Sequence, residues 1–132
     1  MKKLLINTVG KRKRAIANAV LKEGKGKIRI NKVALEHVEP QMARMKIMEP
    51  LLLAGDTSKL DISVRVQGGG QISQADAARV AIGRALVLND KKLQSVFLEY
   101  DRNILVPDVR FKEASKPNRH GAARSHTQKS YR

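Results

Sequence analysis

The chain contains no cysteine and few aromatic residues, and both absences limit what it can be. Without cysteine it forms no disulfide and no cysteine-based zinc site, which suits a cytosolic protein. The core must be built from aliphatic side chains, and a base-stacking platform for single-stranded RNA is disfavoured. The aromatic residues are Phe97, Tyr100, Phe111 and Tyr131.

Long hydrophobic runs are also missing. No segment approaches the roughly 20 apolar residues of a membrane-spanning helix. The apolar run Leu4–Ile6 near the N-terminus is too short for a signal peptide, whose core needs about seven or more such residues. We therefore expect an intracellular protein, and its 132 residues leave room for one small domain with one core.

Acidic residues are scarce at the two ends of the chain. Residues 1–32 hold 11 Lys or Arg and one acid, residues 33–102 hold nine of each sign, and residues 103–132 hold seven bases and two acids. The balanced middle is typical of a solvated protein surface, whereas the ends are not. The excess indicates a polyanionic partner, for which nucleic acid is the leading candidate.

The first third of the chain has the pattern of strands. On an extended backbone, residues 11–14 would project alternately to the two faces. Residues 15–21 and 27–31 flank a glycine-containing turn at 23–26, which predicts a hairpin with one buried and one cationic side. The clearest strand is Leu60–Gln67, where aliphatic and polar residues alternate strictly.

Helical signals follow Pro40, which suits a first helical turn. Pro50 should kink or restart this helix and Gly55 should close it. Its buried stripe is predicted to consist of methionines, acting as core rather than as a ligand surface: Met42, Met45 and Met48.

A second helix is predicted to begin at Ser73, because Ser73 and Asp76, three residues later, resemble a capping box. Its buried face should contain Ala75, Ala78, Ile82, Ala85 and Leu86. Asp90 can cap a shorter third helix with an apolar face that contains Leu93, Val96 and Phe97.

The pattern changes after Arg102. Ile104–Val106 is the last apolar cluster, and the 26 residues from Pro107 onward show no helical or strand period. Such a segment cannot bury enough surface to offset a backbone ordering cost of roughly 1–2 kcal/mol per residue. We expect a globular domain at residues 1–102 and an extended basic tail at 103–132 that is disordered without RNA.

Catalytic and metal-binding motifs are not evident. The glycine run before the second helix could cradle a nucleotide phosphate, but it lacks the flanking residues of a nucleotide-binding loop, so a tight turn or an RNA-backbone contact is favoured. His37, His120 and His126 have no pattern of further ligands around them. The sequence predicts no enzyme, no metal, no cofactor and no small-molecule substrate.

One segment resembles the signature of a known family. Residues 68–86 resemble the strand–turn–helix motif of the universal ninth protein family of the small ribosomal subunit. Residues 10–15 resemble the opening strand of that family, and residues 44–51 and 128–132 resemble its archaeal and eukaryotic branch. Residues 116–127 depart from the branch pattern, which is commonly richer in glycine and basic residues.

The resemblance implies an α/β (α+β) fold, a two-layer sandwich with a split β-α-β unit and a left-handed crossover. It implies a structural role in the head of the small subunit, in the cytoplasm. The expected partners are the 3′ major domain of the small-subunit rRNA, other head proteins, and the anticodon stem-loop of peptidyl-site tRNA. No membrane is implied.

By position in the family, two groups of residues are expected to contact RNA. The rRNA-binding group comprises Lys11, Arg12, Lys13, Arg14, Gly68, Gly69, Gly70, Gln71, Arg102, Arg110, Lys112, Arg119 and Arg124. The tRNA-proximal group comprises Lys129, Ser130, Tyr131 and Arg132.

Two alternatives come from other classes of protein. A DNA-packaging protein would share the charge but should compact duplex DNA as readily as it binds rRNA. A phosphate-handling enzyme would use the glycine run and should bind a nucleotide.

Overall fold

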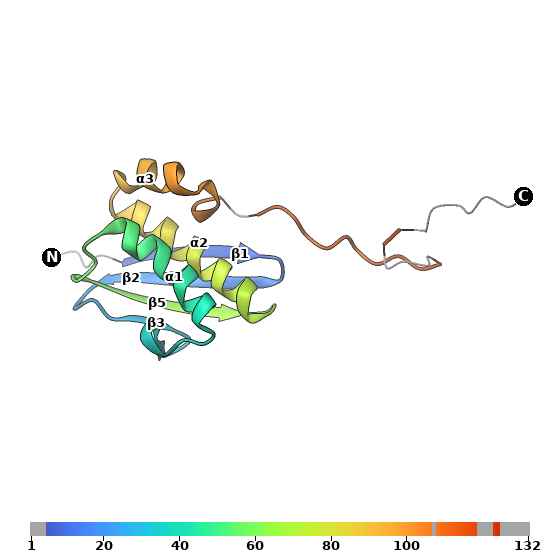
Figure 1. Ribbon diagram of the computed structural model, residues 1–132, viewed down its shortest axis with the longest axis horizontal. Helices are drawn as coiled ribbons and strands as arrows, with labels where there is room; N and C mark the ends of the chain where they lie inside the picture. Colours follow the sequence, from blue (N-terminus) through green and yellow to red (C-terminus); the bar gives the residue numbers. More distant parts are fainter. Residues whose placement is uncertain (1–4, 107, 119–122, 125–132) are drawn as a thin grey trace, which may run out of the picture.

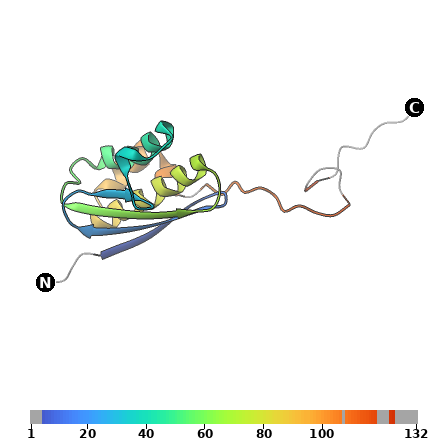
Figure 2. The same cartoon turned by 90° about the horizontal axis from the view of Figure 1, so that it is seen from below.

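A computed structural model of the chain describes residues 5–106, 108–118 and 123–124. These residues form a five-stranded sheet with helices packed on one face, as Figures 1 and 2 show. The strand order is β1-β2-β5-β3-β4. This confirms the predicted α/β class and its two layers. The strands are β1 (Leu5–Arg12), β2 (Ala15–Glu23), β3 (Ile28–Ile30), β4 (Val33–Ala34) and β5 (Leu60–Gln67).

Three α-helices and two short 3₁₀ helices complete the described secondary structure. The α-helices are α1 (Gln41–Ala54), α2 (Gln71–Asn89) and α3 (Leu93–Tyr100). The 3₁₀ helices are η1 (Leu35–His37) and η2 (Arg102–Ile104). None of the helices in this part of the chain is long and apolar enough to span a membrane.

The predicted hairpin between β2 and β3 is wrong. β5 lies between these two strands, antiparallel to β2 and parallel to β3. β2 instead forms its hairpin with β1, from which it is separated by two residues. The reason is non-local: β5 can pair with both neighbours at once, which satisfies its backbone groups on both sides.

β3, α1 and β5 form a β-α-β unit whose two parallel strands pair directly with each other. The split that the resemblance implies, with another strand between these two, is therefore absent. In Figure 1 the helices face the viewer and β5 runs to the right. From β3 the chain passes in front of the sheet through α1 and up to β5. This is the expected left-handed crossover, although such connections are almost always right-handed.

The core lies between the sheet and α2, and it is made largely of small side chains. The five predicted residues of the α2 face are all buried, together with Ala77, Ala81 and Gly83. The facing residues of β2 are alanines at positions 15, 17 and 19. Small residues on both sides let the helix backbone approach the strands closely, and Thr8 Oγ1 of β1 donates a 2.7 Å hydrogen bond to the carbonyl oxygen of Ala81.

The methionine stripe of α1 does not form the core as predicted. Met42 and Met45 are 66% and 58% exposed, because α2 packs against the face that carries Ala43, Ile47 and Leu51. The helix also continues through Pro50 rather than restarting there. Burial of the proline ring offsets the helical hydrogen bond that proline cannot donate. Gly55 closes the helix as expected, with φ at 83°.

The predicted capping box at Ser73 is also wrong. α2 begins at Gln71, with Gly70 in the N-cap position, so Ser73 lies inside the first turn. Asp76 forms ion pairs with cations of β1 and α1 instead of capping. Asp90 accepts a hydrogen bond from the backbone N–H of Lys92 in the turn before α3.

Beyond η2 the described chain leaves the helices and strands. Ile104 is fully buried and packs on Gly83 of α2. Residues 108–118 contain no helix or strand and run away from the sheet and helices in Figure 1. The division of the chain at residues 102 and 103 stays a prediction.

Candidate nucleic-acid interface

The basic cluster after Gly10 is divided between a strand and a turn. Lys11 and Arg12 end β1, and their side chains point to opposite faces of the sheet as expected. Lys13 and Arg14 form the turn into β2 rather than continuing the extended backbone, and Lys13 has φ at 53°. Both turn side chains are exposed, so the hairpin presents two adjacent cations to solvent.

The glycine run packs directly against this turn. Gly68 has φ at 80°, and a Cβ atom there would lie 2.5 Å from the carbonyl oxygen of Arg14. A Cβ atom at Gly69 would lie 3.2 Å from the backbone nitrogen of Ala15. Gly70, in contrast, faces open space. The first two glycines are therefore required for a tight loop against the β1–β2 turn, in agreement with the tight-turn interpretation.

These elements and the start of the C-terminal segment line a single groove of about 650 Å³. We call it the basic groove. Its cationic side chains are Lys13, Arg14, Arg110 and Lys112, and Gly69, Gly70 and Ser73 form the wall at the start of α2. No side chain caps α2, so its first backbone N–H groups add to the positive potential at this wall.

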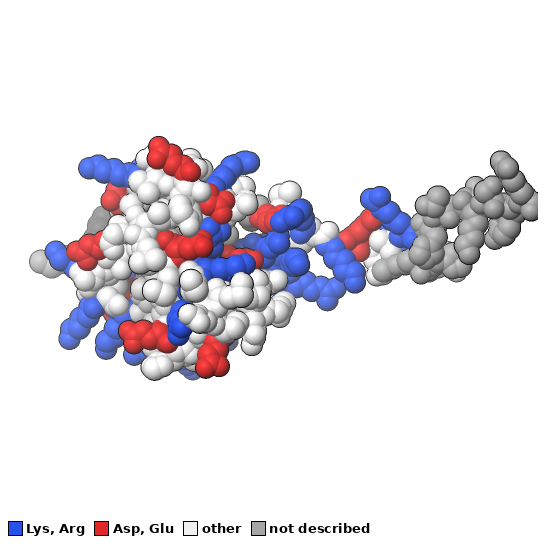
Figure 3. Space-filling model, viewed as in Figure 1, with Lys and Arg blue, Asp and Glu red and all other residues white. Residues whose placement is uncertain are grey.

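The one acid that lines the basic groove is already paired. Glu113 lies 2.8 Å from Arg124 and 3.5 Å from Lys116. Figure 3 shows Lys and Arg gathered where the C-terminal segment leaves the domain, whereas both signs are mixed over the helical face. The groove therefore has the charge of a phosphate-binding surface.

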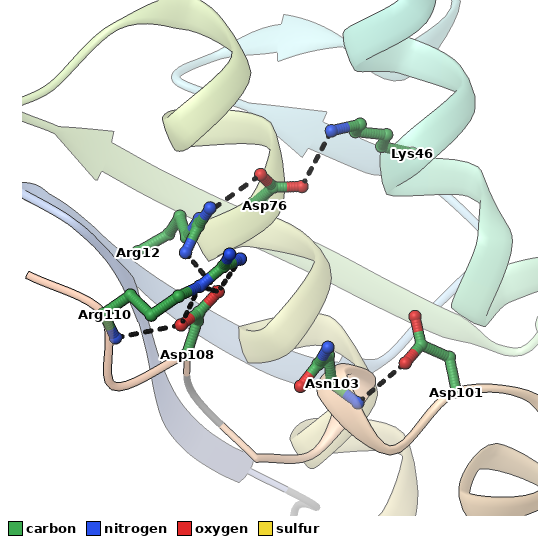
Figure 4. A network of polar contacts seen from close by, with 7 residues as sticks. All are labelled: Arg12, Lys46, Asp76, Asp101, Asn103, Asp108 and Arg110. Atoms are coloured by element: carbon green, nitrogen blue, oxygen red, sulfur yellow. Dashed lines mark hydrogen bonds and ion pairs between the residues drawn. The ribbon is translucent and has the colours of Figure 1, made fainter.

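Arg12 is placed differently from its neighbours, because its guanidinium is engaged inside the protein. It forms an ion pair with Asp108 and lies 3.8 Å from Asp76, which in turn binds Lys46 at 3.2 Å (Figure 4). Asp108 also binds Arg110, with Nη2 at 2.6 Å. Asp108 therefore fastens the beginning of the C-terminal segment to β1, and the expected rRNA contact of Arg12 competes with these carboxylates.

This attachment should depend on pH. Hydrogen bonds from Arg110, and then the charge of Arg12, hold the pKa of Asp108 well below its ordinary value of 3.8. A carboxylate with a lowered folded-state pKa stabilises the attached state fully above that ordinary value, and the contribution is lost as the pH falls below it. We expect the NMR titration midpoint of the Asp108 carboxyl carbon to lie below 3.8 and to rise toward it in Arg110→Ala. An unchanged midpoint in that variant would contradict the assignment.

The other expected RNA-binding residues are dispersed. Arg102 lies in η2 and is exposed, outside the basic groove. Gln71 is exposed as the first residue of α2, and Arg124 is exposed beside Glu113. Arg119 and the group at 129–132 lie outside the described residues.

Sequence reasoning did not single out Phe111, which lines the basic groove and is 63% exposed. The sequence contains a signal for it, because Phe111 is an aromatic residue directly between two basic residues, Arg110 and Lys112. An exposed aromatic ring between two cations can stack on a base or sugar while the cations bind phosphates.

No cluster of metal-ligating side chains occurs in the part of the chain that the structure describes. His37 is exposed in η1, and the other two predicted non-ligand histidines, His120 and His126, lie outside that part.

Comparison with known proteins decides the family. The family model described as ribosomal protein S9/S16 matches residues 10–132. The chain belongs to this family. Small ribosomal subunit protein uS9 of Methanococcus maripaludis strain C7 is 49% identical over 97% of this chain and 98% of that protein. The protein of the same name from Methanococcus vannielii is 48% identical with the same coverage.

As a member of this family, the chain is a ribosomal protein with a structural role and is not an enzyme. It works in the ribosome, in the cytoplasm. The resemblance seen in residues 68–86 is thereby confirmed, and those residues span the loop at the basic groove and most of α2.

Proposed function

We propose that this protein is a constituent of the head of the small ribosomal subunit and that it binds the 3′ major domain of the small-subunit rRNA through the basic groove. The observation that carries the proposal is the convergence of the β1–β2 turn, the glycine loop and residues 110–115 on one surface. Three segments far apart in the sequence each bring backbone amides or cations to it. Other proteins of the head are further partners.

The chemistry of the groove favours the RNA backbone over the bases. Its cations and backbone N–H groups match phosphate oxygens, which position a protein on nucleic acid without reading sequence. The described residues present no helix-turn-helix unit to a DNA groove. Recognition of folded RNA by shape and charge fits this arrangement best.

Binding to rRNA should depend steeply on salt. If the four cations of the basic groove each neutralise one phosphate, a log–log plot of affinity against salt should have a slope of roughly −3 or steeper. The test is a salt titration of the full chain with a transcript of the 3′ major domain. Equal affinity for duplex DNA of the same length, or a slope near zero, would contradict recognition of folded rRNA by the basic groove.

Ile104 and Asp108 attach the beginning of the tail, residues 103–132, to the domain, and we propose that the part beyond residue 118 becomes ordered only within folded RNA. Its last residues, Lys129 to Arg132, then lie near the anticodon stem-loop of peptidyl-site tRNA. The charge of this segment and the match of the family model through residue 132 support this placement.

Removing residues 129–132 should weaken tRNA retention while leaving subunit assembly intact. Loss of even one charge-assisted hydrogen bond, worth roughly 1.5–3 kcal/mol, should reduce peptidyl-site affinity about tenfold or more. The measurement is tRNA binding to purified small subunits that contain the truncated protein. Lys91→Ala is the control, because it removes a positive charge at a position far from residues 129–132 in the sequence. Normal affinity in the truncated subunits would contradict the proposal.

A further inference from the structure

The face of the sheet opposite the helices is not covered by any described element (Figure 2). Alternation along the strands puts one set of side chains on this open face. On β2 and β5 the set includes Asn18, Ser63 and Arg65, and on β3 it includes Arg29. Register pairs Arg29 of β3 with Ser63 of β5, and Asn18 of β2 with Arg65 of β5. Arg29 and Arg65 therefore lie on adjacent strands as diagonal neighbours, offset by two residues.

A hollow of about 690 Å³ lies on this part of the face. Arg29, Arg65 and Lys32 line it, together with the polar side chains of Asn18 and Ser63. Lys32 is held there by the turn between β3 and β4, in which it has φ at 69°. Asn31 locks that turn, since its side chain exchanges hydrogen bonds of 3.1 and 2.8 Å with the backbone of Val66.

The three cations have no carboxylate partner within the described residues. This distinguishes them from arginines on the helix side, such as Arg79, which pairs with Glu49 at 2.6 Å and with Asp101 at 2.9 Å. An ordinary solvated surface mixes both signs, whereas the charged residues that line this hollow are all cations.

The nearest acid on the strands of this face is Asp61, and it is engaged elsewhere. It lies toward the other end of β5, opposite Lys22. Its carboxylate accepts hydrogen bonds of 2.9 Å from the backbone N–H groups of both Lys25 and Lys27. It does not line the hollow and forms no ion pair with Arg29 or Arg65.

We propose that this open sheet face is a second RNA-binding surface, which holds the phosphate backbone of a separate rRNA segment. Cations with amide and hydroxyl donors and no acid match phosphate and ribose, and the absence of an aromatic residue on these strands disfavours base stacking. The inference rests on the proposed function and extends it. The protein would then bridge two segments of rRNA, one in the basic groove and one on the sheet.

A protein partner is the competing occupant of this face. The larger exposed apolar side chains, Leu5, Val9 and Ile16, lie on β1 and β2 rather than around the hollow. Charge therefore favours RNA at the β3–β5 side, where the proposal places it.

The absence of cysteine makes a direct test possible, because a single introduced cysteine is the only thiol in the chain. A tethered hydroxyl-radical probe is placed at Asn18→Cys on the open face and, in a second variant, at Ala114→Cys in the basic groove. Each variant is assembled with the 3′ major domain rRNA and its proteins, and the cleaved nucleotides are mapped. We expect each position to cleave rRNA, at two different segments.

The outcomes separate the two proposals. Cleavage from position 114 without any rRNA cleavage from position 18 would overturn the second surface, leave the proposed function intact and favour a protein partner on the sheet. Absence of rRNA cleavage from both positions would overturn the proposed function, and the further inference with it.

Binding measurements give an independent readout. The double variant Arg29→Gln/Arg65→Gln should reduce the log–log salt slope by roughly 1.4–1.8, the value for two lost phosphate contacts. The control Lys91→Gln/Lys92→Gln removes two exposed charges from the turn after α2 and should leave the slope unchanged. An unchanged slope and affinity in the sheet variant, with its thermal unfolding intact, would overturn the inference.

Discussion

Replacing Gly10 by alanine is expected to lower the free energy of unfolding by about 3 kcal/mol or more, because β1 crosses α2 at this residue without room for a side chain. An added Cβ atom would lie 2.1 Å from the carbonyl oxygen of Ala77 and 2.6 Å from the backbone nitrogen of Ala81. Both atoms belong to the helix backbone, so no side chain can rotate away. The helix itself must shift, which also strains the hydrogen bond from Thr8.

Chemical denaturation of Gly10→Ala and the wild type measures this difference, and the midpoint of thermal unfolding should fall by roughly 10 °C. Gly70→Ser is the matched control. An added side chain there meets open space, and serine in the N-cap position of α2 should leave stability unchanged or slightly raise it. A loss below about 1 kcal/mol in Gly10→Ala would mean that β1 can separate from α2 at little cost.

Reversing the two charges of the β1–β2 turn is expected to reduce affinity for the 3′ major domain rRNA about 100-fold or more. Lys13 and Arg14 are adjacent, exposed and part of the basic groove. If each makes one charge-assisted hydrogen bond to phosphate, their joint loss removes roughly 3–6 kcal/mol, and the new carboxylates add repulsion.

The double variant Lys13→Glu/Arg14→Glu has a closely matched control in Lys91→Glu/Lys92→Glu. Both pairs are exposed neighbours in a turn, and both changes alter the net charge equally. Only the first pair borders the basic groove. Equal losses in the two variants would show that overall charge, rather than the groove, determines binding.

The exposed methionines of α1 show the limit of reading a helix from its own residues. Spacing by three predicted a stripe, and the stripe exists. Whether it is buried depends on which side α2 approaches, and α2 covers the side with Ala43 and Ile47. A helix presents several apolar stripes to a neighbour, so periodicity alone does not choose among them.

The candidate site likewise combines features that local sequence predicts with contacts that only the folded chain creates. The basic turn and the glycine loop were both predicted from local composition, and their contact could not be, because Arg14 and Gly68 lie 54 positions apart in the sequence. The internal partner of Arg12 is Asp108, 96 positions away, so its engagement by a carboxylate was equally hidden. Charge is visible in a sequence, whereas pairing of a charge requires the folded chain.

By itself the sequence determined the features that depend on neighbours along the chain. These are the bounds of β5, the buried face of α2, the closure of α1 at Gly55 and the basic ends. Their signals arise from the two-residue and 3.6-residue periods of the backbone. Only the tertiary structure decided that β5 separates β2 from β3 and that three distant segments line one groove. Strand pairing and charge pairing join residues far apart in sequence, and their energy exists only once the chain has brought them together.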